Sequence, residues 1–192
     1  MIRSLYNWTM RLGESRYALA ALAVVAFVES SVFPIPPDVL LIPMIIARPN
    51  RAFLIAFIAT TASVLGGMFG YYIGATLMDG LGMRILEFYH ATAQFDSLKS
   101  AYNEQGAWAI LIAGVTPFPY KVITILSGAT QLNFGVFVLS SIVARSLRFF
   151  IVAALLWKFG APIRSFIEKR LGLVFIAALA LLVGGFLAVK FL

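Results

Sequence analysis

Five charged side chains lie inside apolar segments of this sequence and are its strongest candidates for chemistry. They are Glu29, Asp38, Lys121, Arg145 and Arg148. Each would cost at least a few kcal/mol if it faced lipid unpaired, so we expect all of them to point inward and toward one another. Acids and bases grouped in this way can exchange protons and bind an anion, or they can form ion pairs that only hold the helices together.

Two proline-rich breaks interrupt the apolar segments next to these charges. The first break contains Pro34, Pro36 and Pro37, and the second contains Pro117 and Pro119. Proline lacks a backbone N–H donor and disfavours helix in the residue before it, so each segment is predicted to fold into two short helical arms. Interrupted backbone is tolerated at membrane depth only where protein covers it or it lines a wet cavity. The breaks therefore indicate a central site.

The composition is that of an integral membrane protein. Of the 192 residues, 61% are hydrophobic and only 12% are charged, and several apolar runs exceed what a soluble core needs. The net charge of +7 would suggest nucleic acid in a soluble protein. In a membrane protein it indicates cytoplasmic anchoring and contact with anionic lipid, so no nucleic-acid partner is expected. The sequence has no cysteine, which excludes disulfides and thiolate metal sites.

The predicted fold class is an all-α polytopic membrane protein. The apolar segment at 17–47 is longer than one span of about 20 residues and shorter than two, so we expect it to enter and leave on one side as a re-entrant hairpin. The second break is expected to do the same. We expect one membrane domain over 1–192: an amphipathic N-terminal helix (1–16), repeat 1 (17–78), an interfacial helix region (79–105), repeat 2 (106–157), and a basic loop with an extra C-terminal transmembrane helix (158–192).

The two halves look like an internal duplication. Asp38 and Lys121 occupy corresponding places in the two breaks, and Val39 corresponds to Val122 at the same offset. A unit of one re-entrant hairpin plus one transmembrane helix crosses the membrane an odd number of times. Its second copy must therefore be inverted, as in many transporters. Basic residues then collect on one side, which predicts a cytoplasmic N-terminus.

Three glycines predict close helix packing in the first long span. Gly66, Gly70 and Gly74 recur at four-residue spacing and so share one helix face, where another backbone can approach closely. We interpret this face as a packing surface rather than a ligand site, because small residues at this spacing are common in membrane helices.

Lys121 gives the sharpest indication of a ligand. It falls in the first turn of the arm after the second break, where its charge opposes the positive end of the helix dipole. An anion held there by backbone N–H groups, Lys121 and either Arg145 or Arg148 would remove the conflict. The three bases are therefore predicted to bind an anionic head group. The acids, Glu29 and Asp38, are predicted to couple protons or cations.

Enzymatic chemistry is not expected. Ser30, Ser31 and Ser127 have no histidine in an apolar segment to activate them. His90, the only histidine, lies in the polar region without partners suited to metal binding. We therefore predict no catalytic residue, no metal and no cofactor.

These residues resemble the DedA superfamily, also called VTT or SNARE-associated Golgi proteins, and most closely its shorter YqaA-like bacterial members. The similarity covers roughly 17–157 and is carried by the order of the motifs: Glu29, Pro34, Pro36, Asp38, the glycine series, Gly106-Ala107-Trp108, the second break and Gly128. The resemblance implies paired re-entrant hairpins in an inverted repeat, and movement of lipids between leaflets, including undecaprenyl phosphate in some bacterial members. It also implies dependence on proton motive force and a need for acids and bases within the membrane.

The second break departs from the family pattern Arg-Phe-x-Pro-Gly-x-Arg. Thr116 stands at the first arginine, and Lys121 lies one residue away from the place of the second. Lysine does not replace a bidentate arginine equivalently. Arg145 or Arg148 could supply the missing cation.

The sequence thus favours a multi-pass protein of the bacterial inner membrane that acts as a flippase or scramblase. It would move an anionic head group, of a phospholipid or a polyprenyl phosphate, between leaflets with proton coupling. Its expected partners are membrane lipids and protons, and a homo-oligomer is compatible with the sequence. Two other hypotheses stay open: a proton-coupled transporter of a small soluble ion, and a structural protein of envelope assembly whose charges only join the repeats.

Overall fold

The computed structural model describes residues 17–33, 36–116 and 118–188, and beyond Gly160 it describes only the backbone and Pro162. The regular elements in these ranges are all helical, as expected for an all-α protein. The predicted N-terminal amphipathic helix (1–16) and two of the break prolines, Pro34 and Pro117, lie outside the described residues.

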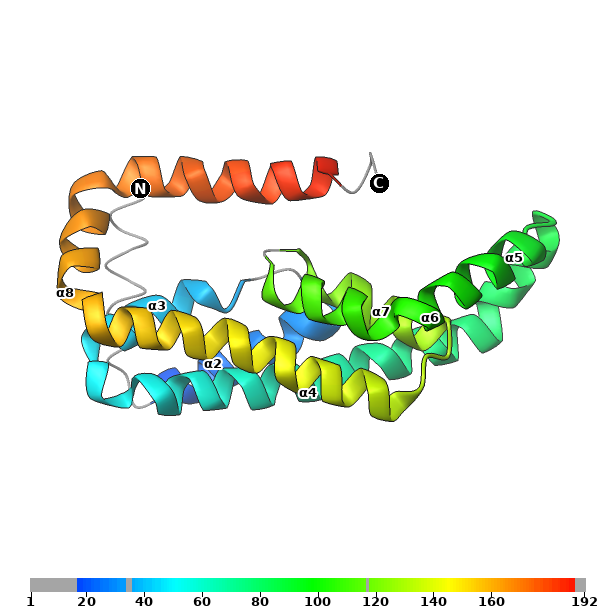
Figure 1. Cartoon of the computed structure of the whole chain (residues 1–192), viewed down its shortest axis with the longest axis horizontal. Coiled ribbons are helices and arrows are strands. Elements are labelled where there is room, and N and C mark those ends of the chain that lie inside the picture. The colour runs from blue at the N-terminus through cyan, green and yellow to red at the C-terminus, as the bar shows by residue number, and fades with distance from the viewer. Residues whose placement is uncertain (1–16, 34–35, 117, 189–192) are drawn as a thin grey trace.

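Two pairs of helices flank the breaks and are called the two hairpins below. The first consists of α2 (Ala18–Ser31) and α3 (Asp38–Ala47), and the second of α6 (Thr92–Val115) and α7 (Tyr120–Ala129). Extended backbone at Thr116 and Pro119 separates α6 from α7, because proline cannot continue the hydrogen bonding of a helix. Figure 1 shows that the hairpins turn near the middle of the molecule and approach it from opposite ends.

Two long helical stretches run the length of the bundle beside the hairpins (Figure 1). The first comprises a 3-10 turn η1 (Pro49–Arg51), α4 (Ala52–Leu77), a π-helical turn η2 (Met78–Gly82) and α5 (Met83–Phe88), and the second is α8 (Phe134–Ala188). Pro49–Phe88 and Phe134–Gly160, of 40 and 27 residues, are long and apolar enough to cross a membrane. The described chain therefore contains two candidate membrane spans beside shorter apolar helices.

Two boundaries differ from those expected from the sequence. The region 79–105 is not separate from the first arm of the second hairpin, since α6 runs unbroken from Thr92 to Val115. The expected basic loop at 158–170 is helical, as part of α8. The physical reason is that neither stretch has clustered prolines, and a helix can accommodate the single Pro162 by bending. Figure 1 shows α8 bending so that its last stretch runs back along the outside of the bundle. A C-terminal transmembrane helix there stays a prediction.

The centre of the bundle is α4, which packs against α2, α7 and α8. Its glycine face brings these helices close. A side chain on Gly66 would overlap the Phe27 carbonyl of α2, and one on Gly74 would overlap the Ile125 carbonyl of α7. Gly70 lies between them against both helices. The missing Cβ atoms therefore let one face of α4 touch the backbones of both hairpins.

Two apolar clusters occupy opposite ends of the bundle. One joins α2, α3 and α8 to the first half of α4 and includes Leu22, Leu41, Ile45, Ile55 and Phe149. The other joins α6 and α7 to the start of α8 and contains Ile110, Tyr120, Leu132 and Phe137. Ser63 of α4 and Arg145 of α8 are buried between these clusters along their helices. The fold thus places a polar layer near the middle of α4 and of the Phe134–Gly160 stretch of α8.

Gly74→Ala is expected to lower the free energy of unfolding by about 1–3 kcal/mol, because the added methyl group meets the backbone of α7 rather than a movable side chain. Thermal unfolding of the purified protein in detergent measures the effect. Gly80→Ala is the matched control, since nothing lies within 4 Å of the position of its methyl group. Equal unfolding midpoints for the two variants would contradict the close packing of α4 on α7.

Candidate functional site

Arg145 lies in the polar layer and is buried, with 1% of its side chain exposed. Its Nη2 donates to Oε2 of Glu29 at 2.8 Å, and its Nε donates to the hydroxyl of Ser63 at 2.6 Å. The guanidinium carbon is 4.6 Å from the ring centroid of Tyr120 and 4.8 Å from that of Phe149. The ion pair, the hydrogen bond and the two ring contacts offset the cost of removing this charge from water.

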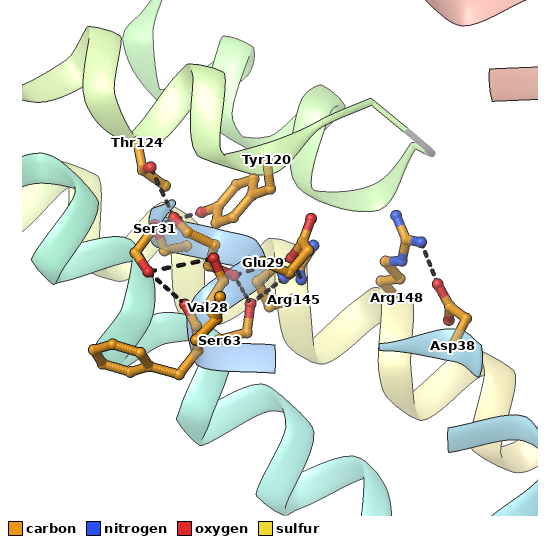
Figure 2. Close-up of polar contacts among 12 residues, drawn as sticks. Val28, Glu29, Ser31, Asp38, Ser63, Tyr120, Thr124, Arg145 and Arg148 are labelled. Carbon is orange, nitrogen blue, oxygen red and sulfur yellow. Dashed lines mark hydrogen bonds and ion pairs between the residues drawn. The ribbon is translucent and has the colours of Figure 1, made fainter. Parts of the chain in front are cut away.

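Hydroxyl groups extend this ion pair into a network across the bundle. The hydroxyl oxygens of Ser30 and Ser63 are 2.6 Å apart, and Ser30 also donates to Glu29 at 3.1 Å. Thr124 of α7 donates to the carbonyl of Ser30 at 2.9 Å. Figure 2 shows Glu29, Ser63 and Arg145 converging from α2, α4 and α8. The network therefore joins both hairpins to both long helices.

A second ion pair lies one turn further along α8. Nη2 of Arg148 is 2.6 Å from Oδ2 of Asp38, which begins α3, and the two side chains are 18% and 23% exposed. Nη1 of Arg148 donates to the carbonyl of Thr116, just after α6, at 2.6 Å. In Figure 2 this pair stands apart from Glu29 and Arg145. The Asp38–Arg148 pair is thus more exposed than the Glu29–Arg145 pair.

The more exposed pair forms part of the wall of a cavity. This cavity has a volume of about 280 Å³ and is lined by Asp38, Val115, Arg148, Ile151 and Val152. Val115 and Ile151 are 42% and 50% exposed, so the apolar part of the wall opens toward the surroundings of the bundle. The cavity therefore combines a guanidinium and a carboxylate with an exposed apolar side.

Lys121 contacts the first hairpin rather than the start of its own helix. Its Nζ donates to the carbonyl of Val32 at 3.1 Å. Val32 caps the C-terminus of α2, where the negative end of the helix dipole favours a cation. The conflict predicted at the start of α7 is therefore relieved by a contact across the bundle. A bound anion is not needed to explain a cation at this position.

The structure brings the predicted charges together in a different grouping. The sequence predicts bases that share an anion, whereas Arg145 and Arg148 each pair with a carboxylate of the first hairpin. The hydroxyl partners Ser30, Ser63 and Thr124 are missed by the sequence reasoning, because single serines and threonines are common in apolar helices and have no distinctive spacing. Among the residues described, no group of three His, Cys, Asp or Glu side chains could hold a metal ion.

Comparison with known proteins identifies the family. The model of the VTT domain matches residues 33–158, which contain both breaks, the glycine face and both arginines of the site. The chain belongs to the VTT-domain family. Membership in this family, the DedA superfamily expected from the sequence, makes it a membrane protein of a transporter-like class rather than of an enzyme class.

Two relatives of this VTT-domain protein cover most of its length. An uncharacterized protein of Haemophilus influenzae and an uncharacterized homologue from Histophilus somni are each 38% identical to it over 169 residues. Each match covers 86% of this chain and 88% of the relative. No solved structure matches the chain.

Glu29→Gln is expected to lower the free energy of unfolding by about 3–5 kcal/mol, because it leaves the buried guanidinium of Arg145 without a counter-charge. Asp38→Asn should cost less than this, since both members of its ion pair are partly exposed and the pair borders a cavity. Denaturant unfolding of the two variants in one detergent measures the difference. Equal losses would show that the two pairs do not differ in the way their burial indicates.

Proposed function

We propose that this VTT-domain protein moves an anionic lipid head group between the leaflets of a membrane, coupled to protons. The observation that carries the proposal is the cavity beside Asp38 and Arg148, with its accessible guanidinium and exposed apolar wall. A guanidinium suits a phosphate group, because it can donate two parallel N–H bonds to the phosphate oxygens. An apolar wall at Val115 and Ile151 suits acyl chains that remain in the bilayer.

In this proposal α4 and the first part of α8 cross the bilayer, and the two hairpins re-enter from opposite faces as an inverted repeat. Helix lengths support this placement. α2 has 14 residues, and α3 and α7 have 10 each, whereas a complete span needs about 20. α6 has 24 residues, but its first part is polar and only the part from Gly106 to Val115 is continuously apolar. The turns of the hairpins then lie near the midplane, where interrupted backbone must be covered by protein or line a wet cavity.

The proposed location is the bacterial inner membrane, with the N-terminus in the cytoplasm. Arg48, Arg51 and Lys158 lie at the end of the bundle where α4 begins. Arg84 and Lys99 lie toward or beyond the other end, together with Asp79, Glu87, Asp96 and Glu104. Cytoplasmic segments of membrane proteins carry an excess of lysine and arginine. This bias supports a cytoplasmic location for the basic end.

The charged residues have separate roles in the proposal. Lys121 and Arg148 bind the head group, and both border the place where the hairpins meet, since they contact Val32 and Thr116 at the two breaks. Asp38 takes up protons, whereas Glu29, for which the sequence predicted the same role, stays ionised as the counter-charge of buried Arg145. Arg145, which is buried and paired, holds the first hairpin against α8 and does not contact the head group.

Two other functions would use the same charges. A transporter of a small soluble ion needs no lateral opening, so the exposed apolar wall of the cavity favours a lipid. A purely structural protein of envelope assembly needs the two ion pairs but gains nothing from a cavity beside one of them. The cavity and its exposed apolar wall therefore favour lipid transport over both alternatives.

Arg148→Ala and Lys121→Ala are each expected to slow translocation of head-group-labelled anionic lipid in proteoliposomes by about tenfold or more. Each variant removes a charge-assisted hydrogen bond to phosphate, and such bonds are worth roughly 1.5–3 kcal/mol. Arg84→Ala is the matched control, because Arg84 is an exposed cation on α5. A wild-type rate in either folded variant would remove that residue from the head-group site.

The same proteoliposomes distinguish the alternative functions when uptake of a soluble anion is measured beside lipid movement. Lipid movement without soluble uptake supports the proposal. Soluble uptake without lipid movement would favour the ion transporter, and neither activity would favour the structural protein.

A further inference from the structure

The two ion pairs of α8 have different surroundings, which suggests that only one of them can exchange partners. Arg145 is held by a carboxylate, a hydroxyl and two aromatic rings, and 1% of it is exposed. Arg148 is held by the Asp38 carboxylate and the Thr116 carbonyl, and it lines the cavity. A ligand entering the cavity would therefore meet Arg148 beside Asp38 and would not reach Arg145.

A carboxylate and a phosphate bind a guanidinium through the same donors. Both present oxygens to the N–H groups of arginine in similar geometry, so they compete for one guanidinium. In the structure Asp38 already occupies Nη2 of Arg148, at 2.6 Å, and the Thr116 carbonyl occupies Nη1. An anion can therefore accept the hydrogen bond from Nη2 of Arg148 only after Asp38 has released this group.

Charge balance determines how that release can occur at membrane depth. The resting Asp38–Arg148 pair is neutral. If Arg148 turned to an anion while Asp38 stayed ionised, the Asp38 carboxylate would lose its counter-charge in an apolar layer, which is costly. A proton that arrives with the anion converts Asp38 to its neutral acid, so that Arg148 pairs with the anion and no unpaired carboxylate is left.

We propose that Asp38 acts as an internal competitor for the anionic group of the substrate, and that binding of each monoanion to Arg148 takes up one proton on Asp38. This inference rests on the site of the proposed function and adds to it the step that couples the anion to the proton. The proton comes from water, binds a carboxylate oxygen of Asp38 and leaves when the anion leaves. No covalent bond other than this O–H bond forms or breaks.

The other charged groups near Asp38 do not need to change their protonation when the anion binds. α3 packs against α2, α4, α8 and η1. The charged groups of these elements and of the neighbouring hairpin turn closest in position to Asp38 are Glu29 on α2, Arg145 and Arg148 on α8, and Lys121 on α7. Arg48 and Arg51 lie at the far end of α3, and the other charged residues of α8 come later along it: Lys158, Arg164, Glu168, Lys169 and Arg170. Glu29 and Arg145 neutralise each other, and α4 has no charged residue over Ala52–Leu77. Lys121 adds a positive charge that favours the incoming anion.

The test measures binding of a phosphodiester to the full-length protein in a neutral detergent by calorimetry between about pH 5 and pH 9. Dihexanoyl phosphatidylglycerol is the lipid probe and dimethyl phosphate the soluble one. Both carry a single negative charge that does not titrate in this range. Tighter binding of the lipid probe indicates that the natural ligand is a lipid head group. Equal affinities for the two probes would favour a soluble anion as the natural ligand.

The wild-type protein should bind its probe more weakly as the pH rises, by up to about tenfold for each pH unit, since the bound state holds one more proton than the free state. Asp38→Asn should bind independently of pH, at least as tightly as the wild type at its lowest pH. Asp38→Asn combined with Arg148→Gln should bind at least tenfold more weakly than Asp38→Asn alone. Asp96→Asn, which changes an exposed carboxylate on α6, is the matched control and should keep the wild-type slope.

A second measurement uses only the wild-type protein, so it tests the inference even if Asp38→Asn fails to fold. Proton uptake on addition of the probe to the wild-type protein, followed with an indicator dye in weak buffer, should approach one proton per anion bound toward the alkaline end of this pH range. Binding without proton uptake, binding independent of pH, or no binding of either probe would overturn the inference.

If lipid moves in proteoliposomes but binding is independent of pH, the exchange is wrong and the proposed movement of lipid stands. If the soluble probe binds with proton uptake but no lipid moves, the exchange stands and the lipid function is wrong.

Discussion

A charge inside an apolar layer has to be neutralised where it lies, and this requirement organises the bundle. Arg145 meets it with a carboxylate from α2, a hydroxyl from α4 and an aromatic ring from α7. These groups are distant from one another in the sequence. The buried guanidinium is therefore satisfied only when both hairpins and both long helices are in place.

The proline breaks end helices inside the bundle, and the backbone carbonyl groups at these ends accept hydrogen bonds from cationic side chains. A helix that ends inside the bundle leaves carbonyl groups without intrahelical partners. Lys121 donates to Val32 after α2, and Arg148 donates to Thr116 after α6. Each cation thus sits near the negative end of a helix dipole and comes from a different element. The interrupted backbone and the charged side chains stabilise each other.

Close backbone approach makes this polar layer compact. The hydrogen bond between Ser30 and Ser63, at 2.6 Å, requires α2 and α4 to lie side by side, and Gly66 of α4 provides the space. Gly128 does the same from α7, where an added side chain would overlap the carbonyl of Tyr71. Small residues therefore bring the hairpins close enough for short side chains to reach across. At Asp38 and Arg148 the layer borders a cavity, whereas Arg145 is buried.

The sequence by itself determined the all-helical class, the two breaks and the set of charges that had to meet. Apolar length, the missing N–H of proline and the cost of an unpaired charge in a membrane are local properties, so they can be predicted from residue types and spacing. Only the tertiary structure decided which acid pairs with which base, that Lys121 reaches α2, and that the hydroxyl of Ser63 holds Arg145. These contacts depend on how each helix is rotated and how closely it packs, and that is set by the simultaneous packing of residues far apart in the chain.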